Sequence, residues 1–321
     1  MPPIKAAAGI DVGGTFAKVG IIDASGRLLR EDKIATEPAR GPQDFVARMA
    51  ALLSAWRAEG SAFSAAGLAI AGDVDSEKGI LRFSPNLEGW DGFPLRGALA
   101  KALRLPVVMD NDANLAVWGA YRTELKGKPE NVVGVTLGTG VGGGLVLGRR
   151  LYRGSTGSAG EIGHTRVEVP GELCHCGMRG CLEAYAGSYG IVRRARLALA
   201  REPRGGSRLR RLCPDLKLLE PAHLSEAARH GDALAREVLR ETGFYVAIGL
   251  SNLVLVLNPD AVLILGGVSR AGRWLLDPIE AYFKKQPFKV PFSRAKLKLA
   301  ENPNAGRIGA ALLALEEGRG R

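Results

Sequence analysis

The feature that most constrains this chain is a pair of glycine-rich turns, each set between two apolar runs. The first lies in Gly9-Ile-Asp-Val-Gly-Gly-Thr15 and the second in Gly134-Val-Thr-Leu-Gly-Thr-Gly140, and the two segments match position by position. Glycines let backbone N–H groups approach an anion closely, and a threonine hydroxyl adds a further donor. We therefore expect two related halves, each with a strand–turn–strand unit that grips phosphate.

The two turns differ at one important position. Asp11 stands in the first where Thr136 stands in the second. An acidic side chain beside bare backbone N–H groups suits a site that handles metal-bound phosphate. A simple glycine hairpin would explain either segment alone, but the repetition favours phosphate binding.

The second turn also fits a dinucleotide-binding pattern through Gly138, Gly140 and Gly143. That pattern must open a helix. Residues 145–152 instead predict strand, turn and strand. We reject the dinucleotide interpretation.

The order of the predicted elements favours two α/β lobes around a cleft, because strands alternate with helices in two repeats. The length of 321 residues suffices for two such lobes. We place the smaller lobe at 1–115 plus 302–321 and the larger at 116–301. The last predicted helix, 305–317, should pack back onto the N-terminal lobe. Strands are predicted at 5–10, 17–23, 28–36, 66–71, 80–83, 106–110, 261–265 and 295–300, with a pair of strands around 138–144. Helices are predicted at 42–59, 112–124, within 182–200, within 231–257, and at 271–285 and 305–317.

Charge and hydropathy bear on partners and location. The net charge is +11. Much of the excess lies in one cluster: Arg193, Arg194, Arg196, Arg201, Arg204, Arg208, Arg210 and Arg211. A polyanion-binding patch is one interpretation, but no aromatic residues interleave with these arginines, so we favour a solvated helix end and loop. No apolar run approaches membrane-spanning length, and residues 1–8 are too short for a signal peptide. We expect a cytoplasmic protein with no membrane or specific nucleic-acid partner.

One histidine and three cysteines have the spacing of a metal site. His164 precedes Cys174, Cys176 and Cys181, and together they offer four ligands for a tetrahedral zinc ion. Four protein ligands leave no position for a catalytic water, so the site would be structural. Reduced buried cysteines are the alternative. Cys213 has no evident place in the set.

Asp112 is our candidate general base, because it stands where a predicted strand ends and a helix begins. Phosphoryl transfer has a loose transition state, so a well-placed carboxylate of ordinary pKa suffices. The alternative is that Asp112 only caps the helix.

Glu161 and Glu183 flank the cysteines, and carboxylates fixed by a metal-bound loop suit sugar hydroxyls. Asn86 would add an amide. The simpler explanations are a solvated loop glutamate at 161, a helix-dipole glutamate at 183, and a turn asparagine at 86.

These motifs together resemble the ROK family (repressors, open reading frames, sugar kinases), over about residues 9–317. The resemblance rests on Asp11-Val-Gly-Gly-Thr15, Asn111-Asp-Ala-Asn114, Gly160-Glu-Ile-Gly-His164 and Cys174-His-Cys-Gly-Met-Arg-Gly-Cys-Leu-Glu183. It implies an actin-like, ribonuclease-H-like ATPase fold with a hexose in the interlobe cleft, a homodimer, and ATP and Mg²⁺ beside the structural Zn²⁺. One departure is Asp73, where the family often has proline.

The resemblance also implies residue roles. Asp112 would be the base for the sugar 6-hydroxyl, and His164 would serve both zinc and sugar. The sugar would be held by Gly72, Asn86, Asn111, Asp112, Glu161, His164 and Glu183. ATP phosphates and magnesium would be held by Asp11, Gly13, Gly14, Thr15, Thr139 and Gly140, with Gly266 and Gly267 against the adenosine.

Several functions compete. A sugar-responsive repressor would need a DNA-binding domain, and only ten residues precede Asp11. The predicted zinc site and sugar carboxylates disfavour a non-catalytic or cytoskeletal actin-like ATPase. A non-catalytic sugar-binding regulator stays an alternative to the kinase. Among kinases, the segment 84–94 resembles the version that phosphorylates glucose. Mannose, fructose, N-acetylglucosamine and N-acetylmannosamine stay open, as does polyphosphate as the donor, because of the arginine cluster.

Overall fold

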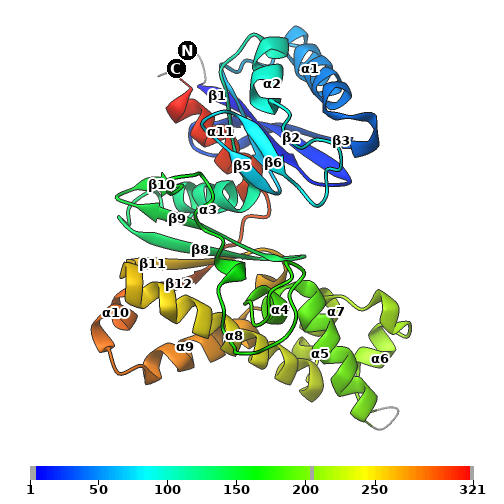
Figure 1. Cartoon of the computed structure of the whole chain (residues 1–321), viewed down its shortest axis with the longest axis vertical. Helices are drawn as coiled ribbons and strands as arrows, with labels where there is room; N and C mark the ends of the chain where they lie inside the picture. Colours follow the sequence, from blue (N-terminus) through cyan, green and yellow to red (C-terminus); the bar gives the residue numbers. More distant parts are fainter. Residues whose placement is uncertain (1–4, 203–205, 319–321) are drawn as a thin grey trace. The chain divides into compact units, whose positions relative to one another are not determined.

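The computed structural model describes residues 5–202 and 206–318, so Arg204 of the arginine cluster lies outside the described residues. The chain divides into two compact units and contains two five-stranded sheets (Figure 1). Unit 1 comprises residues 1–128, 144–160 and 302–321, and unit 2 comprises 129–143 and 161–301. The predicted α/β class is confirmed.

The sheet of unit 1 has the strand order β3-β2-β1-β4-β7. Strand β1 pairs antiparallel with β2 and parallel with β4, so β1 lies at the centre of the sheet. The strands are β1 (Ala6–Val12), β2 (Phe16–Asp23), β3 (Leu28–Ala35), β4 (Ala66–Ile70) and β7 (Val107–Asn111). The central strands are almost wholly buried, as parallel strands covered by helices should be.

Four helices accompany this sheet: α1 (Pro42–Ala58), α2 (Leu95–Leu103), α3 (Asp112–Thr123) and α11 (Ala305–Glu317). One face of α1 buries Phe45, Met49, Leu53 and Trp56, as its helical periodicity predicts. A small hairpin, β5 (Asp73–Asp75) and β6 (Ile80–Phe83), stands apart from the main sheet. Helix α2 and strand β5 were not predicted from the sequence.

The last helix packs on unit 1, as predicted. Helix α11 contacts β1, β4 and α3. The approach to α3 is so close that a Cβ at Gly309 would lie 1.8 Å from the carbonyl oxygen of Leu115. Since α3 is fastened to α11 in this way, residues 116–128 belong with unit 1, beyond the boundary at 115 that we predicted. Residues 144–160 also belong there.

The second sheet repeats the layout of the first, with the order β10-β9-β8-β11-β12. Strand β8 pairs parallel with β11, just as β1 pairs with β4. Its strands are β8 (Val132–Leu137), β9 (Val141–Leu147), β10 (Arg150–Tyr152), β11 (Ala261–Leu265) and β12 (Lys296–Leu299). The predicted internal duplication is therefore confirmed at the level of strand order. A strand follows the second turn, so rejection of the dinucleotide pattern is also confirmed.

Helices make up most of the rest of unit 2 (Figure 1). They are α4 (Glu183–Ala186), α5 (Ser188–Arg201), α6 (Leu209–Leu212), α7 (Pro221–Arg229), α8 (Ala233–Leu257), α9 (Arg273–Lys285) and α10 (Lys289–Arg294). By length and composition α8 passes the test for a membrane span, contrary to our expectation that no segment would. Its apolar window is 56% buried inside the protein, as in the core helix of a soluble protein.

Candidate functional site

The first glycine turn joins β1 to β2 and is held by hydrogen bonds on both sides. The N–H of Gly13 donates to the carbonyl of Phe16 at 3.1 Å. From the end of β3, Thr36 donates its hydroxyl to the carbonyl of Gly13 at 2.7 Å and its N–H to the carbonyl of Thr15 at 2.9 Å. The turn is thus fixed, while the side chain of Thr15 is exposed.

Asp11 lies at the end of β1, directly before this turn. Burial raises the pKa of its carboxyl group, although Lys18 and Arg307 oppose the shift. Lys18 stands opposite Asp11 across the β1–β2 pair. A carboxylate in such surroundings is stabilised by an added cation, which is the property that a metal-bound phosphate site requires.

Asn86 belongs to the same neighbourhood of unit 1. A Cβ built on Gly14 would lie 3.1 Å from the Cβ of Asn86, so only a glycine fits easily between the turn and this asparagine. Asn86, predicted to bind the sugar, therefore lies beside the turn that is predicted to bind phosphate.

The strand β7 ends at Asn111, and α3 begins at Asp112. The N-cap of α3 is Asn111, whose side-chain oxygen accepts from the N–H groups of Ala113 at 2.9 Å and Asn114 at 3.2 Å. The alternative that Asp112 serves merely as the cap is therefore wrong, although its carboxylate also accepts from Ala113 at 2.9 Å. Asp112 occupies the first turn of a helix that its neighbour already caps.

Gly72 and Asn111 are joined directly. The side-chain nitrogen of Asn111 donates to the carbonyl of Gly72 at 3.0 Å. Gly72 has a φ of 130°, and a Cβ there would lie 2.3 Å from the carbonyl oxygen of Phe83. Both the backbone conformation and the space demand glycine at this position.

Sequence reasoning missed the ion pair beneath this helix start. Asp110 is 1% exposed, and it accepts from Nε of Arg153 at 2.5 Å and from the amide of Asn114 at 2.9 Å. The same arginine donates to Glu317 at 3.1 Å. A buried carboxylate needs such a partner. The acidic pair 110 and 112 was visible in the sequence, but nothing indicated Arg153.

Asp73, the departure from the family pattern, has a partner in unit 1 as well. It accepts from Arg82 at 3.0 Å and from the hydroxyl of Ser158 at 2.8 Å. Arg82 also donates to the carbonyl of Thr156 at 2.6 Å. These bonds fasten the segment that precedes Glu161 to the β5–β6 hairpin.

In unit 2, the four predicted metal ligands converge. The ligand atoms of His164, Cys174, Cys176 and Cys181 all lie within 4.8 Å of one another. Nδ1 of His164 lies 3.8 Å from Sγ of Cys174, and the sulfurs of Cys176 and Cys181 are 3.7 Å apart. Two Zn–S bonds of about 2.3 Å at the tetrahedral angle place their sulfurs about 3.8 Å apart. The donor set and its spacing fit zinc.

Tight turns hold these ligands together. The N–H of Cys174 donates to the carbonyl of Met178 at 2.8 Å, and Gly177 and Gly180 both have positive φ. Burial raises the pKa of Cys181 to about 12 and that of Cys174 above its ordinary value. A cation that replaces the thiol protons would relieve this cost.

The second glycine turn joins β8 to β9. The N–H of Gly138 donates to the carbonyl of Gly140 at 3.0 Å. The carboxylate of Glu183, the first residue of α4, accepts from the N–H of Val141 at 3.0 Å. A Cβ on Gly140 would lie 2.3 Å from that carboxylate. Glu183 therefore contacts the predicted phosphate turn, while Thr139 at its tip is exposed.

Gly266 and Gly267 follow β11 and lie beside the end of β8. A Cβ on Gly266, whose φ is 93°, would lie 2.3 Å from the carbonyl oxygen of Leu137. The hydroxyl of Ser269 donates to the carbonyl of Gly266 at 2.7 Å. The two glycines predicted to contact adenosine and the turn predicted to bind phosphate thus lie next to each other, at the ends of the neighbouring strands β11 and β8.

The predicted site residues fall into two groups, one in each unit. Unit 1 holds Asp11, Gly13, Gly14, Thr15, Gly72, Asn86, Asn111 and Asp112. Unit 2 holds Thr139, Gly140, Glu161, Glu183, Gly266, Gly267 and the four metal ligands. Glu161 is the N-cap residue of a 3₁₀ turn (Ile162–His164) that carries the ligand histidine.

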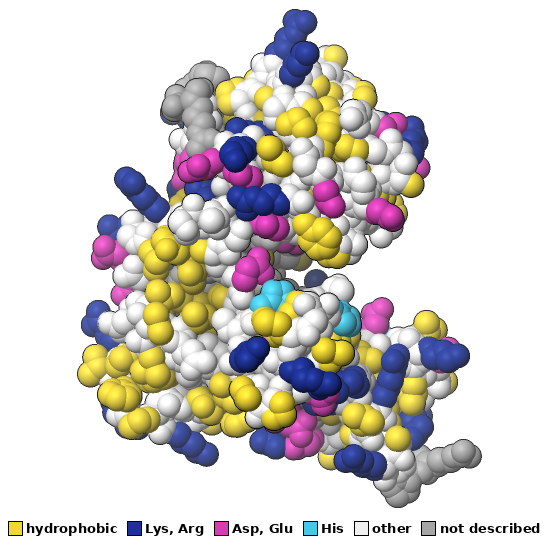
Figure 2. Space-filling model, in the orientation of Figure 1, with side chains coloured by type: hydrophobic (Ala, Val, Ile, Leu, Met, Phe, Trp, Pro, Cys, Tyr) yellow, Lys and Arg dark blue, Asp and Glu magenta, His cyan; other side chains and the backbone are white. Residues whose placement is uncertain are grey.

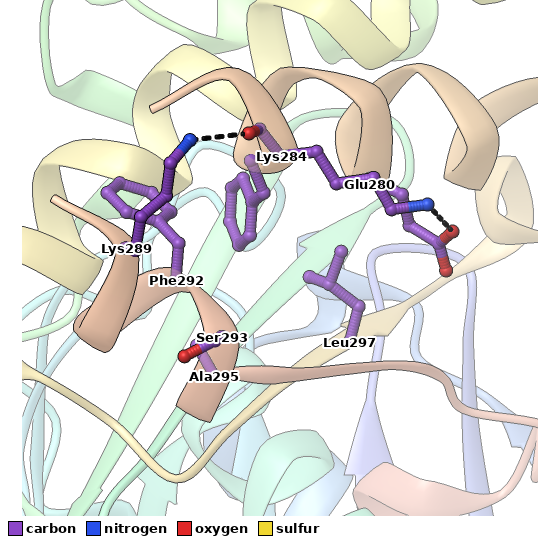
Figure 3. Close-up of a pocket in the computed structure, with 8 residues that line it drawn as sticks. Glu280, Lys284, Lys289, Phe292, Ser293, Ala295 and Leu297 are labelled. Carbon is purple, nitrogen blue, oxygen red and sulfur yellow. Dashed lines mark hydrogen bonds and ion pairs between the residues drawn. The ribbon is translucent and has the colours of Figure 1, made fainter. Parts of the chain in front are cut away.

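A separate cavity of about 420 Å³ in unit 2 contains none of the predicted residues (Figure 3). It is lined by Phe283, Phe292, Leu297 and the polar side chains of α9 and α10. Its lysines are engaged, because Lys289 donates to the carbonyl of Lys284, and Lys284 lies 3.8 Å from Glu280. The cavity offers no convergent polar groups for a nucleotide or a sugar.

The arginine cluster has structural partners. Arg196 donates to the carbonyl of Leu216 at 2.8 Å, and Arg210 to that of Leu199 at 2.5 Å. Arg194 donates to the hydroxyl of Thr242 at 2.5 Å, and Arg193 pairs with Glu172. Figure 2 shows lysine and arginine side chains interspersed with acidic and apolar ones on the face it presents. These contacts support the solvated helix end rather than a polyanion patch.

Comparison with known proteins gives consistent matches over the whole chain. The model of the ROK family matches residues 7–317. A Streptomyces coelicolor protein named glucokinase is 36% identical over 313 residues, which cover 96% of this chain and 97% of that protein. A ROK family glucokinase from Streptomyces griseus, solved with glucose and AMPPNP, has a TM-score of 0.82 at 37% identity, covering 97% of this chain and 99% of that one. A ROK hexokinase from Thermus thermophilus has a TM-score of 0.78 at 31% identity, covering 98% and 100%.

Proposed function

This chain belongs to the ROK family, and we propose that it is an ATP-dependent kinase that transfers a phosphoryl group to the 6-hydroxyl of glucose. Its α/β architecture is the two-lobed actin-like, ribonuclease-H-like ATPase fold of that family. The observation that carries the proposal is the match, over nearly the full chain, to enzymes named glucokinase, one of them solved with glucose and a nucleotide.

Asp112 is the proposed general base. Its carboxylate accepts the proton of the 6-hydroxyl while the hydroxyl oxygen forms a bond to the γ-phosphorus and the bond from that phosphorus to the β–γ bridging oxygen breaks. ADP leaves with the electrons of the broken bond. Because the transition state is loose, placement of the carboxylate matters more than its basicity. The start of α3, capped by Asn111 and held by the hydrogen bond from Asn114 to Asp110, would supply that placement.

The two glycine turns are the proposed phosphate-binding elements. Backbone N–H groups at Gly14 and Thr15 in one unit, and at Thr139 and Gly140 in the other, would bind phosphate oxygens. Gly13, whose N–H already donates to Phe16, would shape the first turn. Asp11 would hold Mg²⁺, which neutralises phosphate charge when it is bound. Gly266 and Gly267 would lie against the adenosine.

Asn111, one of the residues proposed to bind the sugar, keeps hydrogen-bonding capacity for a sugar hydroxyl. The side-chain oxygen of Asn111 already accepts two backbone N–H groups, and its nitrogen donates one hydrogen to Gly72. One hydrogen of that amide is left for a sugar oxygen. The remaining proposed sugar contacts are Gly72, Asn86, Glu161, His164 and Glu183.

We also propose one structural zinc ion per chain, held by His164, Cys174, Cys176 and Cys181, whose spacing supports it. The proposal includes a homodimer in the cytoplasm without a specific nucleic-acid partner. Polyphosphate as the donor has weaker support, because four of the arginines that suggested it, Arg193, Arg194, Arg196 and Arg210, contact other groups within unit 2.

A coupled assay for ADP release with ATP and magnesium tests the substrate. Glucose, mannose, fructose, N-acetylglucosamine and N-acetylmannosamine are compared at matched concentrations. We expect the highest kcat/KM with glucose. A higher value for any other sugar would contradict the assignment of glucose, and turnover with polyphosphate but not with ATP would contradict the donor.

A further inference from the structure

The phosphate turn of unit 2 is held by one residue that the family pattern did not single out. Ser188, the first residue of α5, donates its hydroxyl to the carbonyl of Gly138 at 2.6 Å. Its N–H donates to the same carbonyl at 3.0 Å and to that of Thr139 at 3.2 Å. Two consecutive carbonyls of the turn therefore point at this one serine.

These bonds determine where the N–H groups of the turn point. In a trans peptide the C=O of one residue and the N–H of the next lie on opposite sides of the bond. With the carbonyls of Gly138 and Thr139 drawn towards Ser188, the N–H groups of Thr139 and Gly140 are directed away from α5. Those are two of the donors proposed for the phosphates.

The helix start approaches the turn closely because residue 187 is glycine. A Cβ on Gly187 would lie 2.8 Å from the carbonyl oxygen of Glu183 and 3.3 Å from that of Thr139. A larger residue would push the serine away from the turn. The clamp thus depends on the pair Gly187-Ser188.

Residues of α4 and α5 also contact the segment 164–181 that carries the four proposed zinc ligands, which we call the metal-binding loop. The two carboxylate oxygens of Glu183 take different partners: one accepts from Val141 in the turn, and the other lies 3.6 Å from Sγ of Cys174. Tyr189, next to the serine, also directs its hydroxyl to Sγ of Cys174 at 3.6 Å. A short chain of contacts therefore runs from a metal ligand to the phosphate turn, entirely inside unit 2.

We propose that Ser188 is a positioning residue for nucleotide binding, and that it and Glu183 tie the phosphate turn to the metal-binding loop. Glu183 then has a task beyond the sugar contact that the family resemblance gives it. The inference rests on the proposed function, because it takes the second glycine turn as a nucleotide site.

The test is calorimetric titration of the zinc-loaded full chain with AMPPNP and magnesium, without sugar. Loss of one partly buried hydrogen bond should raise the Kd of Ser188→Ala about three- to tenfold. The matched control is Ser251→Ala, which removes an equally short serine-to-carbonyl bond of 2.6 Å within α8. The control should bind AMPPNP as the wild type does.

Two further readouts separate positioning from general damage. Ser188→Thr keeps the hydroxyl and should bind within about twofold of the wild type, and Ser188→Ala should keep its zinc content and its KM for glucose. An AMPPNP Kd for Ser188→Ala within twofold of the Ser251→Ala value would overturn the inference alone. Failure of the wild type to bind AMPPNP would overturn the proposed function as well.

Discussion

Each of the two glycine turns is held by a hydroxyl side chain, but the two hydroxyl residues come from different kinds of element. In unit 1 the carbonyl of Gly13 is gripped by the hydroxyl of Thr36 at 2.7 Å, and in unit 2 the matching carbonyl of Gly138 is gripped by the hydroxyl of Ser188 at 2.6 Å. Each of these residues also donates its N–H to a turn carbonyl. The duplication therefore extends beyond strand order to the way each turn is pinned.

The differences lie in what surrounds each turn. We call Thr36 and Ser188 the tethers of the two turns. Thr36 follows the edge strand β3, whereas Ser188 begins α5, a helix that contacts the metal-binding loop. Unit 1 also carries a half-buried carboxylate, Asp11, where unit 2 has Thr136. We infer that the first turn supplies charge for a metal ion and the second supplies neutral donors that depend on the metal-binding loop.

Within the comparison of the two turns, the largest expected effect is at Asp11. Asp11→Asn should lower kcat/KM for ATP by about 100-fold or more, since it removes the carboxylate proposed to hold magnesium. Thr136→Val, at the matching position, should cost less than about threefold, because no charge is lost. Steady-state kinetics at saturating glucose measure both. Equal losses in the two variants would break the comparison.

Asp11→Asn should also stabilise the ligand-free protein. Because burial raises the pKa of Asp11 above 3.8, the folded state binds this proton more tightly than the unfolded chain does. The stability that Asp11 contributes therefore falls as the pH rises from 3.8 through the folded pKa. Asp11→Asn should unfold at a higher temperature than the wild type at pH 7, and the difference should shrink as the pH approaches 4. Thermal denaturation at both pH values measures it.

Removal of the metal should have the next largest effect. Cys181→Ser should lose zinc, unfold at a lower temperature, and lose about 10- to 100-fold in kcat/KM for glucose. Its affinity for AMPPNP should fall too, because the metal-binding loop supports the second turn. The matched control is Cys213→Ser, a buried cysteine whose sulfur lies 3.1 Å from the carbonyl of Asp215. Elemental analysis should find one zinc in the control, and full zinc content in Cys181→Ser would refute the ligand set.

The smallest expected effect comes from substitution of Thr36, the residue of unit 1 that corresponds to Ser188 in unit 2. Thr36 is fully buried, so Thr36→Val should leave the carbonyl of Gly13 without its hydroxyl partner and raise the Kd for AMPPNP about three- to tenfold. Thr123→Val removes a similar 2.7 Å bond in α3 and serves as the control. A change confined to Ser188→Ala, with none in Thr36→Val, would show that only the second turn needs its tether.

The sequence predicted those features that depend on local pattern. Glycines in both turns, the cysteine spacing and the periodicity of the last helix each reflect a local requirement of the backbone or of a ligand set. The strand–turn–strand motifs, the converging ligands and the packing of α11 were accordingly confirmed.

Features that depend on tertiary contact could not be read in this way. The partners Thr36 and Ser188 are 23 and 50 residues from the carbonyls they hold, and Arg153 is 43 residues from Asp110. Nothing local marks them. The cap of α3 was assigned to Asp112 as an alternative because both Asn111 and Asp112 are good capping residues, and only the geometry distinguishes them. Helix α10 was missed because Pro291 interrupts its short pattern.

The most direct test of the account is the turnover of Asp112→Asn, measured as glucose 6-phosphate formed from glucose, ATP and magnesium. The wild type should form the product, and the variant should lose essentially all activity while it still binds glucose in a calorimetric titration. Turnover of the variant within tenfold of the wild type would contradict the role of Asp112 as the base.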